Sequence, residues 1–224
     1  MRHVGAKNWR YLKNKRKTLN STAFARYITI KHYLPVNDLT RKGNLGEILL
    51  CEYIQEVAHY TAYVTKLTYN PNVEQSMKGD DVLMFNPADI GKDVIYAESK
   101  IRQSPSSTVI KQIVNNLTGN KRFPSSINFA IQILRDKGWD ELANAIDALQ
   151  TDIAEGKASI KNIGWLISSR STDPAYDTLK KVKNNLNVSS NPNLAFVAVG
   201  IDAVQQFVDD VYQQANTILL TGKL

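Results

Sequence analysis

The chain is poor in the residues that build disulfide frameworks and transition-metal sites. It has one cysteine, Cys51, and three histidines among 224 residues. A single thiol excludes an intramolecular disulfide and a Cys-rich zinc site. His3, His32 and His59 are widely spaced, so the sequence gives little support to a histidine-based metal site or a histidine-dependent nuclease.

Nucleotide-binding and hydrolase loops are also missing. The sequence contains no G-x-x-x-x-G-K-[ST] motif, and no G-x-G-x-x-G or G-x-S-x-G follows an expected strand. We therefore expect that the chain does not hydrolyse ATP by itself.

No apolar run approaches the ~18 residues of a membrane span, and the first ten residues lack the apolar stretch of a signal peptide. Hydrophobic residues make up 43% of the chain and charged residues 22%, which is close to the average of globular proteins. These observations predict a folded, soluble, cytoplasmic protein without a membrane partner.

Positive charge is concentrated at the N-terminus. Residues 1–42 contain eleven Lys and Arg against one acid and carry a net charge of +10, whereas residues 43–224 carry −3. We therefore divide the chain into a basic segment, 1–42, and a main domain, 43–224. The centre of the segment is KNKRK, and aromatic residues are interspersed around it, which suits phosphate contacts and base stacking. The residues expected to bind nucleic acid are Lys13, Lys15, Arg16 and Lys17. A solvated extension and a surface that docks on an acidic partner protein are the alternatives.

Hydrophobic periodicity predicts a single α/β domain in 43–224, with a mixed central sheet flanked by helices. The expected helices cover 45–58 (capped by Asn44), a segment from 107 or 108, 126–155, 173–186 and 203–220. The expected strands are 61–69, 81–85, 94–102, 162–169 and 194–201.

Three acids and a lysine fall at notable places in this pattern. Leu49, Tyr53 and Val57 define the expected apolar face of the first helix, and Glu47 falls beside Leu50, Cys51 and Ile54 instead. Asp81 opens a strand, and strand alternation points Glu98 and Lys100 the same way, about 7 Å apart. Each feature has an ordinary alternative: a boundary glutamate paired to a cation, a solvated turn, and an exposed strand edge.

The order of these residues along the chain indicates a function more specifically than any one of them does. A helix with Glu, a strand with Asp and a strand with Glu-x-Lys, all within about sixty residues, resemble the core of the PD-(D/E)XK nucleases, a restriction-endonuclease-like fold. Phosphodiester cleavage needs a hard cation such as Mg²⁺ (or Mn²⁺) that polarises the phosphoryl oxygen and lowers the pKa of the attacking water. The pattern therefore predicts a metal-dependent nuclease.

Three stretches narrow the resemblance. RKGNLGEILL, MKGDDVLMF and YAESKIR resemble the HamA family, the nuclease-like subunit of Hachiman anti-phage defence. This resemblance implies a bacterial host, degradation of nucleic acid, with DNA the expected substrate, and HamB, a superfamily 2 helicase, as partner. By motif position it places the catalytic residues at Glu47, Asp81, Glu98 and Lys100.

We expect Asp81 and Glu98 to bind the metal with the Ser99 carbonyl, Glu47 to complete the site, and Lys100 to position the nucleophile. Asp80 is the alternative to Asp81, but adjacent strand residues point to opposite faces and Asp81 leads directly into the strand. Two other functions remain open. One is a stand-alone, site-specific restriction endonuclease, and the other is a non-catalytic nucleic-acid-binding or inhibitory module on the same fold.

Overall fold

A four-stranded mixed sheet forms the centre of the computed structural model. The structure describes residues 6–70, 72–75, 81–118, 125–169, 177–178, 180–181 and 193–221. The strands are β1 (Val82–Phe85), β2 (Asp93–Arg102), β3 (Ser159–Ser168) and β4 (Leu194–Gly200), in the order β1-β2-β3-β4. β1 is antiparallel to β2, and β2, β3 and β4 are mutually parallel. The predicted α/β class and mixed sheet are confirmed.

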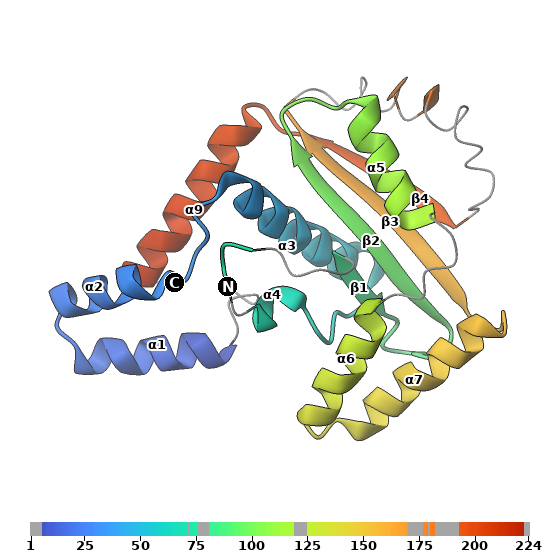
Figure 1. Ribbon diagram of the computed structural model, residues 1–224, viewed down its shortest axis with the longest axis horizontal. Coiled ribbons are helices and arrows are strands. Elements are labelled where there is room, and N and C mark those ends of the chain that lie inside the picture. The colour runs from blue at the N-terminus through green and yellow to red at the C-terminus, as the bar shows by residue number, and fades with distance from the viewer. Residues whose placement is uncertain are drawn as a thin grey trace.

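Helices cover both faces of this sheet (Figure 1). On one face lie α3 (Asp38–Ala58) and α9 (Val204–Thr221); on the other lie α5 (Ser107–Thr118), α6 (Ser125–Asp136) and α7 (Asp140–Ala154). The alternation along β2 explains this arrangement, because Ile95 and Ala97 pack in the cluster with α3 and α9, whereas Val94 and Tyr96 pack with α6 and α7. A parallel pair needs a long crossover, and α5, α6 and α7 supply it between β2 and β3.

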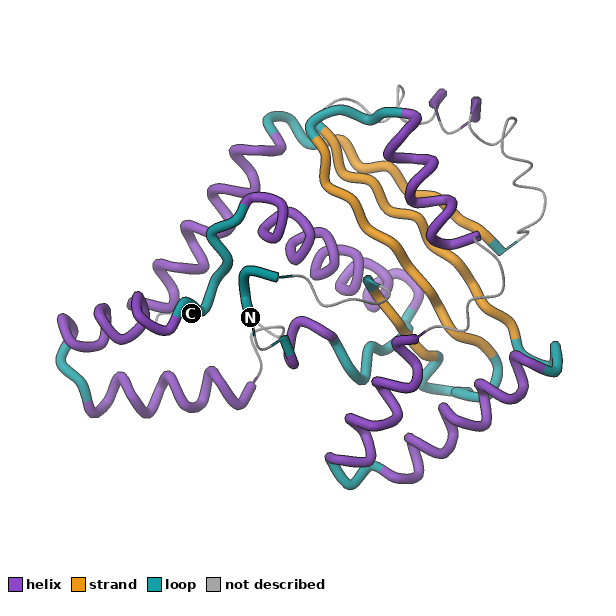
Figure 2. The backbone as a smooth tube through the Cα atoms, in the orientation of Figure 1, coloured by secondary structure: helices purple, strands orange, loops and turns teal. Residues whose placement is uncertain are grey.

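The basic segment is helical rather than extended. It forms α1 (Ala6–Thr18) and α2 (Ser21–Lys31), and these two helices project with the end of α9 as an arm beside the sheet (Figures 1 and 2). Leu12, Phe24 and Ile28 bury their side chains with Leu219 of α9 in a small core of their own. Helix α3 runs without interruption across residue 42, so the backbone is continuous helix where the basic segment passes into the main domain.

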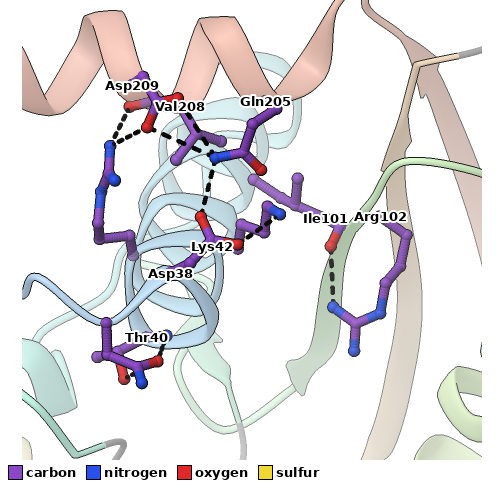
Figure 3. A network of polar contacts seen from close by, with 10 residues as sticks. Asp38, Thr40, Lys42, Ile101, Arg102, Gln205, Val208 and Asp209 are labelled. Carbon is purple, nitrogen blue, oxygen red and sulfur yellow. Dashed lines mark hydrogen bonds and ion pairs between the residues drawn. The ribbon is translucent and has the colours of Figure 1, made fainter.

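A polar network joins the start of α3 to α9 (Figure 3). The guanidinium of Arg41 lies 2.6 Å from Oδ1 of Asp209, and the Gln205 amide donates to Asp38 at 2.9 Å. Tyr212 donates its hydroxyl hydrogen to the Arg41 carbonyl at 3.1 Å. These contacts fix α9, whose end belongs to the arm, to α3, which carries Glu47.

Helix α3 begins earlier than predicted. Its N-cap is Asn37, whose side chain accepts a hydrogen bond from the Thr40 backbone N–H, so Asn44 lies inside the helix. The predicted apolar face was also wrong, because Val57 is 62% exposed and the buried face holds Leu50, Cys51 and Ile54.

The predicted strand 61–69 was wrong as well. Thr61 makes an isolated bridge to Phe85, and the chain then turns into the short helix α4 (Lys66–Tyr69). Tertiary contacts override the β-branched pattern of this segment, and among them are the ion pairs of Lys66 with Glu47 and Asp81. The other predicted strands match β1 to β4, and the predicted helices after Ser106 match α5, α6, α7 and α9. The predicted helix 173–186 falls mostly outside the described residues.

Candidate active site

Asp81 is fixed at the open end of the β1–β2 pair. Val82 pairs with Ala97, so continuing the antiparallel register sets Asp81 beside Glu98. The backbone N–H of Ser99 donates to Oδ2 of Asp81 at 2.9 Å. This bond anchors the carboxylate at the strand that carries the Glu-x-Lys motif. Asp80, the alternative, lies outside the described residues.

Lys100 joins the two carboxylates of this strand pair. Its ammonium donates to Oε1 of Glu98 and lies 4.0 Å from Oδ2 of Asp81. The structure therefore brings Asp81, Glu98 and Lys100 together, as the alternation of β2 predicts. The amide of Asn116, on α5, donates to the same Oε1 of Glu98 at 2.9 Å. Sequence reasoning missed Asn116, since only the packing of α5 on the sheet brings it here.

Glu47 reaches the site from α3. Its side chain is only 7% exposed, and its Oε1 lies 3.0 Å from the ammonium of Lys66. The same ammonium lies 3.2 Å from Oδ1 of Asp81. Lys66 thus connects the acid of the helix to the acid of the strand. The sequence pattern does not point to Lys66, because residues 61–69 favour a strand.

A close approach of α3 to β2 sets the position of Glu47. A Cβ atom at Gly46 would lie 2.4 Å from Oγ of Ser99, so only glycine fits here without a shift. The Ser99 hydroxyl is itself buried and has no hydrogen-bond partner among the residues that the structure describes. Glycine at position 46 therefore lets the helix bring Glu47 against the edge of the sheet.

Burial shapes the ionisation of these acids. Desolvation raises the pKa of Glu47 from 4.5 to about 8, although the charge of Lys66 opposes the shift. Desolvation and the nearby charge of Asp81 also raise the pKa of Glu98, against the opposing effect of Lys100. Burial lowers the pKa of Lys66, but the two carboxylates outweigh it and the pKa is raised in sum. Burial therefore opposes the negative charge on Glu47 and Glu98, whereas the two neighbouring carboxylates favour the charged form of Lys66.

The donor set can be tested for its fit to a hard divalent cation. Carboxylate oxygens of Glu47, Asp81 and Glu98 and a backbone carbonyl at Ser99 are the ligand types that Mg²⁺ and Mn²⁺ prefer. Within the described residues, however, no three or more His, Cys, Asp and Glu side chains already converge as a metal cluster. A cation does lie between two of the carboxylates, and it is the ammonium of Lys66. The oxygen donors are of the type that such a cation takes, and in this structure the ammonium of Lys66 lies between two of them.

Comparisons with known proteins identify the family. A model of the HamA family matches residues 3–215. The Hachiman protein HamA of Bacillus cereus is 36% identical over 220 residues, which cover 98% of this chain and 77% of that protein. The chain belongs to the HamA family. The resemblance drawn from the three sequence stretches is thereby confirmed, and the family match includes the basic helices α1 and α2 as well as the sheet.

In this HamA-family chain the four basic residues predicted to bind nucleic acid lie on α1 of the helical arm, not on the sheet (Figure 1). Lys13 and Lys17 of α1 are exposed. Lys15 lies over the rings of Tyr11 and Tyr27, at 5.6 and 6.0 Å from their centroids. Arg16 donates to the Leu220 carbonyl at 3.3 Å. Lys15 and Arg16, which are predicted to contact nucleic acid, therefore also stabilise the arm.

In the part of the chain that the structure describes, no helix is both long enough and apolar enough to cross a bilayer.

Proposed function

We propose that this HamA-family chain is a metal-dependent nuclease of Hachiman anti-phage defence, which cleaves phosphodiester bonds of DNA as the effector beside a helicase subunit. One observation carries the proposal: Lys100 contacts both Asp81 and Glu98 at the open end of β1 and β2. An acid pair bridged by a lysine at a sheet edge, with a buried Glu47 beside it, matches the requirements of hydrolysis at a phosphodiester.

Each residue has a separate role in this proposal. Asp81 and Glu98 would hold Mg²⁺ or Mn²⁺ with the Ser99 carbonyl, and Glu47 would complete the ligand set. When bound, the ion supplies Lewis acidity toward the phosphoryl oxygen and a water of lowered pKa. Lys100 orients the attacking water and offsets negative charge that develops on the phosphate. Asn116 is a positioning residue that holds the Glu98 carboxylate.

Two observations support a helicase partner: the chain belongs to the HamA family, and its sequence lacks a motif for ATP hydrolysis. The chain has no nucleotide-binding loop, so a helicase partner of the HamB kind, from superfamily 2, would supply ATP-driven movement along DNA. We further propose that the complex restrains the nuclease in the bacterial cytoplasm, because a non-specific nuclease left active would damage its own host.

The test uses the full chain, alone and with the helicase, on plasmid and linear DNA in Mg²⁺, Mn²⁺ or EDTA. We expect cleavage to require a divalent cation. Lys100→Ala and Glu98→Gln should abolish cleavage while largely retaining DNA binding. Lys111→Ala, at an exposed position on α5, is the matched control and should cleave normally.

Other outcomes identify the alternatives. Discrete fragments cut by the chain alone would indicate a site-specific restriction endonuclease. DNA binding without cleavage under every condition, with the helicase present, would contradict the nuclease and indicate a binding module.

A further inference from the structure

Lys66 occupies an unusual position between two acids from different elements. Its ammonium lies 3.0 Å from Glu47 on α3 and 3.2 Å from Asp81 before β1. The side chain of Lys66 is 11% exposed, that of Glu47 7% and that of Asp81 16%. The lysine comes from α4, which contributes no other residue to these ion pairs. One side chain from a connecting segment thus holds the two carboxylates together.

The surroundings explain why a cation is needed here. Two carboxylates at a common buried position repel each other, and each loses hydration that water would supply. Contact with an ammonium offsets both costs, since a buried charge is tolerated when it is paired and hydrogen-bonded. The Lys66 ammonium does for Glu47 and Asp81 what a bound metal ion would do.

The charges of the cluster argue against the site holding the Lys66 ammonium and a divalent metal ion at the same time. Among the described residues of the site, Glu47, Asp81 and Glu98 face Lys66 and Lys100, so the fully ionised cluster carries one net negative charge. A divalent ion added with Lys66 in place would leave one net positive charge in a largely buried site. The same ion added with Lys66 withdrawn would leave none.

We propose that the Lys66 ammonium is a built-in counter-ion of the metal-free site, and that it must leave Glu47 and Asp81 before a divalent cation can be ligated by both. This inference rests on the proposed metal site. The long side chain and the short helix α4 let the ammonium withdraw while α3 and the sheet stay in place. Lys66 is thus a regulating residue of the site, and metal competes with it for the same oxygens.

The first experiment measures metal affinity by calorimetry in Lys66→Met, which keeps the length of the side chain and removes its charge. We expect Mg²⁺ and Mn²⁺ to bind more tightly than to the unaltered chain, by about tenfold or more. Lys42→Met is the matched control: Lys42 is 16% exposed and lies 2.7 Å from Asp38, away from the site. Its metal affinity should equal that of the unaltered chain.

Thermal unfolding gives a second readout that does not depend on cleavage. In EDTA, Lys66→Met should melt at a lower temperature than the unaltered chain, because two buried acids lose their cation. Added Mg²⁺ should raise its melting temperature by more than it raises that of the unaltered chain.

The third measurement uses the unaltered chain and therefore does not depend on the folding of a variant. In protein with ¹⁵N-labelled lysine, the buried ammonium of Lys66 should give an NMR signal protected from exchange with water. Mg²⁺ should abolish this protection while the signals of lysines away from the site remain.

The outcomes separate the inference from the proposed function. If the unaltered chain binds the metal while Lys66→Met binds it equally or more weakly, or if the protected signal persists at saturating Mg²⁺, the counter-ion role is overturned and the metal site stands. If neither protein binds Mg²⁺ or Mn²⁺, the metal site and the counter-ion role are both overturned.

Discussion

The backbone N–H of Ser99 donates to Oδ2 of Asp81 across the open end of the β1–β2 pair, at 2.9 Å. This bond continues the antiparallel pairing by one step beyond Val82 and Ala97, with a side chain in place of a backbone carbonyl. It holds the carboxylate where Lys66 and Lys100 can both approach it. Asp81 thus connects the parts of the site, since Lys66, Lys100 and the backbone of Ser99 all contact its carboxylate.

Replacing Asp81 separates its charge from its hydrogen bond. Asp81→Asn keeps an oxygen that can accept from Ser99, so the fold should survive, but the amide lacks the charge that a hard cation requires. We expect Mg²⁺ binding and cleavage to be lost, as measured by calorimetry and a plasmid assay. Asp80→Asn is the matched control and should retain much of both. If Asp80→Asn is the variant that loses Mg²⁺, Asp80 and not Asp81 holds the metal.

Glu47 should make the stability of the metal-free protein depend on pH. Its pKa is 4.5 in a solvated reference and about 8 in the folded chain. A raised pKa means that the stabilisation is complete below the unfolded value and is lost as pH rises through the folded value. In EDTA, we expect the free energy of unfolding to fall by about 2 to 3 kcal/mol between pH 6 and pH 9 because of this group.

Glu47→Gln isolates this contribution, because the amide resembles the protonated acid and does not titrate. Urea unfolding in EDTA should give the variant a flatter pH profile than the unaltered chain. Equal slopes in the two proteins would mean that Glu47 is already ionised at pH 6.

Asn116 should set the acidity of Glu98. Its amide donates to the carboxylate and lowers the pKa, against burial and the charge of Asp81, which raise it. Asn116→Ala should therefore raise the pKa of Glu98 further. Carbon NMR of ¹³C-labelled glutamate carboxyls measures this directly, and Asn115→Ala on the same helix is the control. Equal Glu98 titrations in Asn116→Ala and the unaltered chain would show that the amide only packs there.

Much of this site could be predicted from the sequence because strand periodicity is local. The alternation of β2 sets Glu98 and Lys100 on one side, and Asp81 follows from its place before an apolar strand. Lys66 could not be predicted, since the β-branched residues around it favour a strand and its two partners, Glu47 and Asp81, come from other elements of the fold. Asn116 depends on how α5 packs on the sheet, a contact that joins residues far apart in the chain.

The same distinction applies to the fold. Apolar runs are enough to predict β1 to β4, but the start of α3 depends on whether Asn37 or Asn44 caps it, and both are suitable residues. Glu47 was placed correctly beside Leu50, Cys51 and Ile54, yet the buried face was assigned to Leu49, Tyr53 and Val57. Packing against the sheet, rather than the helix pattern alone, decides which of two apolar stripes is buried.

Gly46 and Ser99 should be coupled in stability. Gly46→Ala brings a Cβ atom to 2.4 Å from the Ser99 hydroxyl oxygen, so we expect a loss of about 1 to 3 kcal/mol in urea unfolding. Ser99→Ala removes that oxygen, leaves neighbours at 3.4 and 3.5 Å, and eliminates a buried hydroxyl without a partner. The double variant should recover most of the loss. A double variant as unstable as Gly46→Ala alone would show that the backbone of β2, not the hydroxyl, limits the approach.

The basic arm should bind DNA through its exposed lysines. Lys13 and Lys17 of α1 are exposed, and Lys15 and Arg16 contact other residues of the arm. Neutralising Lys13 and Lys17 to Gln should weaken DNA binding. It should also reduce the slope of log affinity against log salt by about 2, if each contacts one phosphate.

The same substitutions at Lys15 and Arg16 make a useful comparison. Lys15 lies over two tyrosine rings and Arg16 bonds to the Leu220 carbonyl, so their loss should lower the melting temperature as well as DNA affinity. Fluorescence anisotropy with labelled DNA at several salt concentrations measures the slope, and pull-down with the helicase measures the alternative. An unchanged salt slope with all four residues neutralised, together with loss of helicase binding, would show that the arm docks a protein rather than DNA.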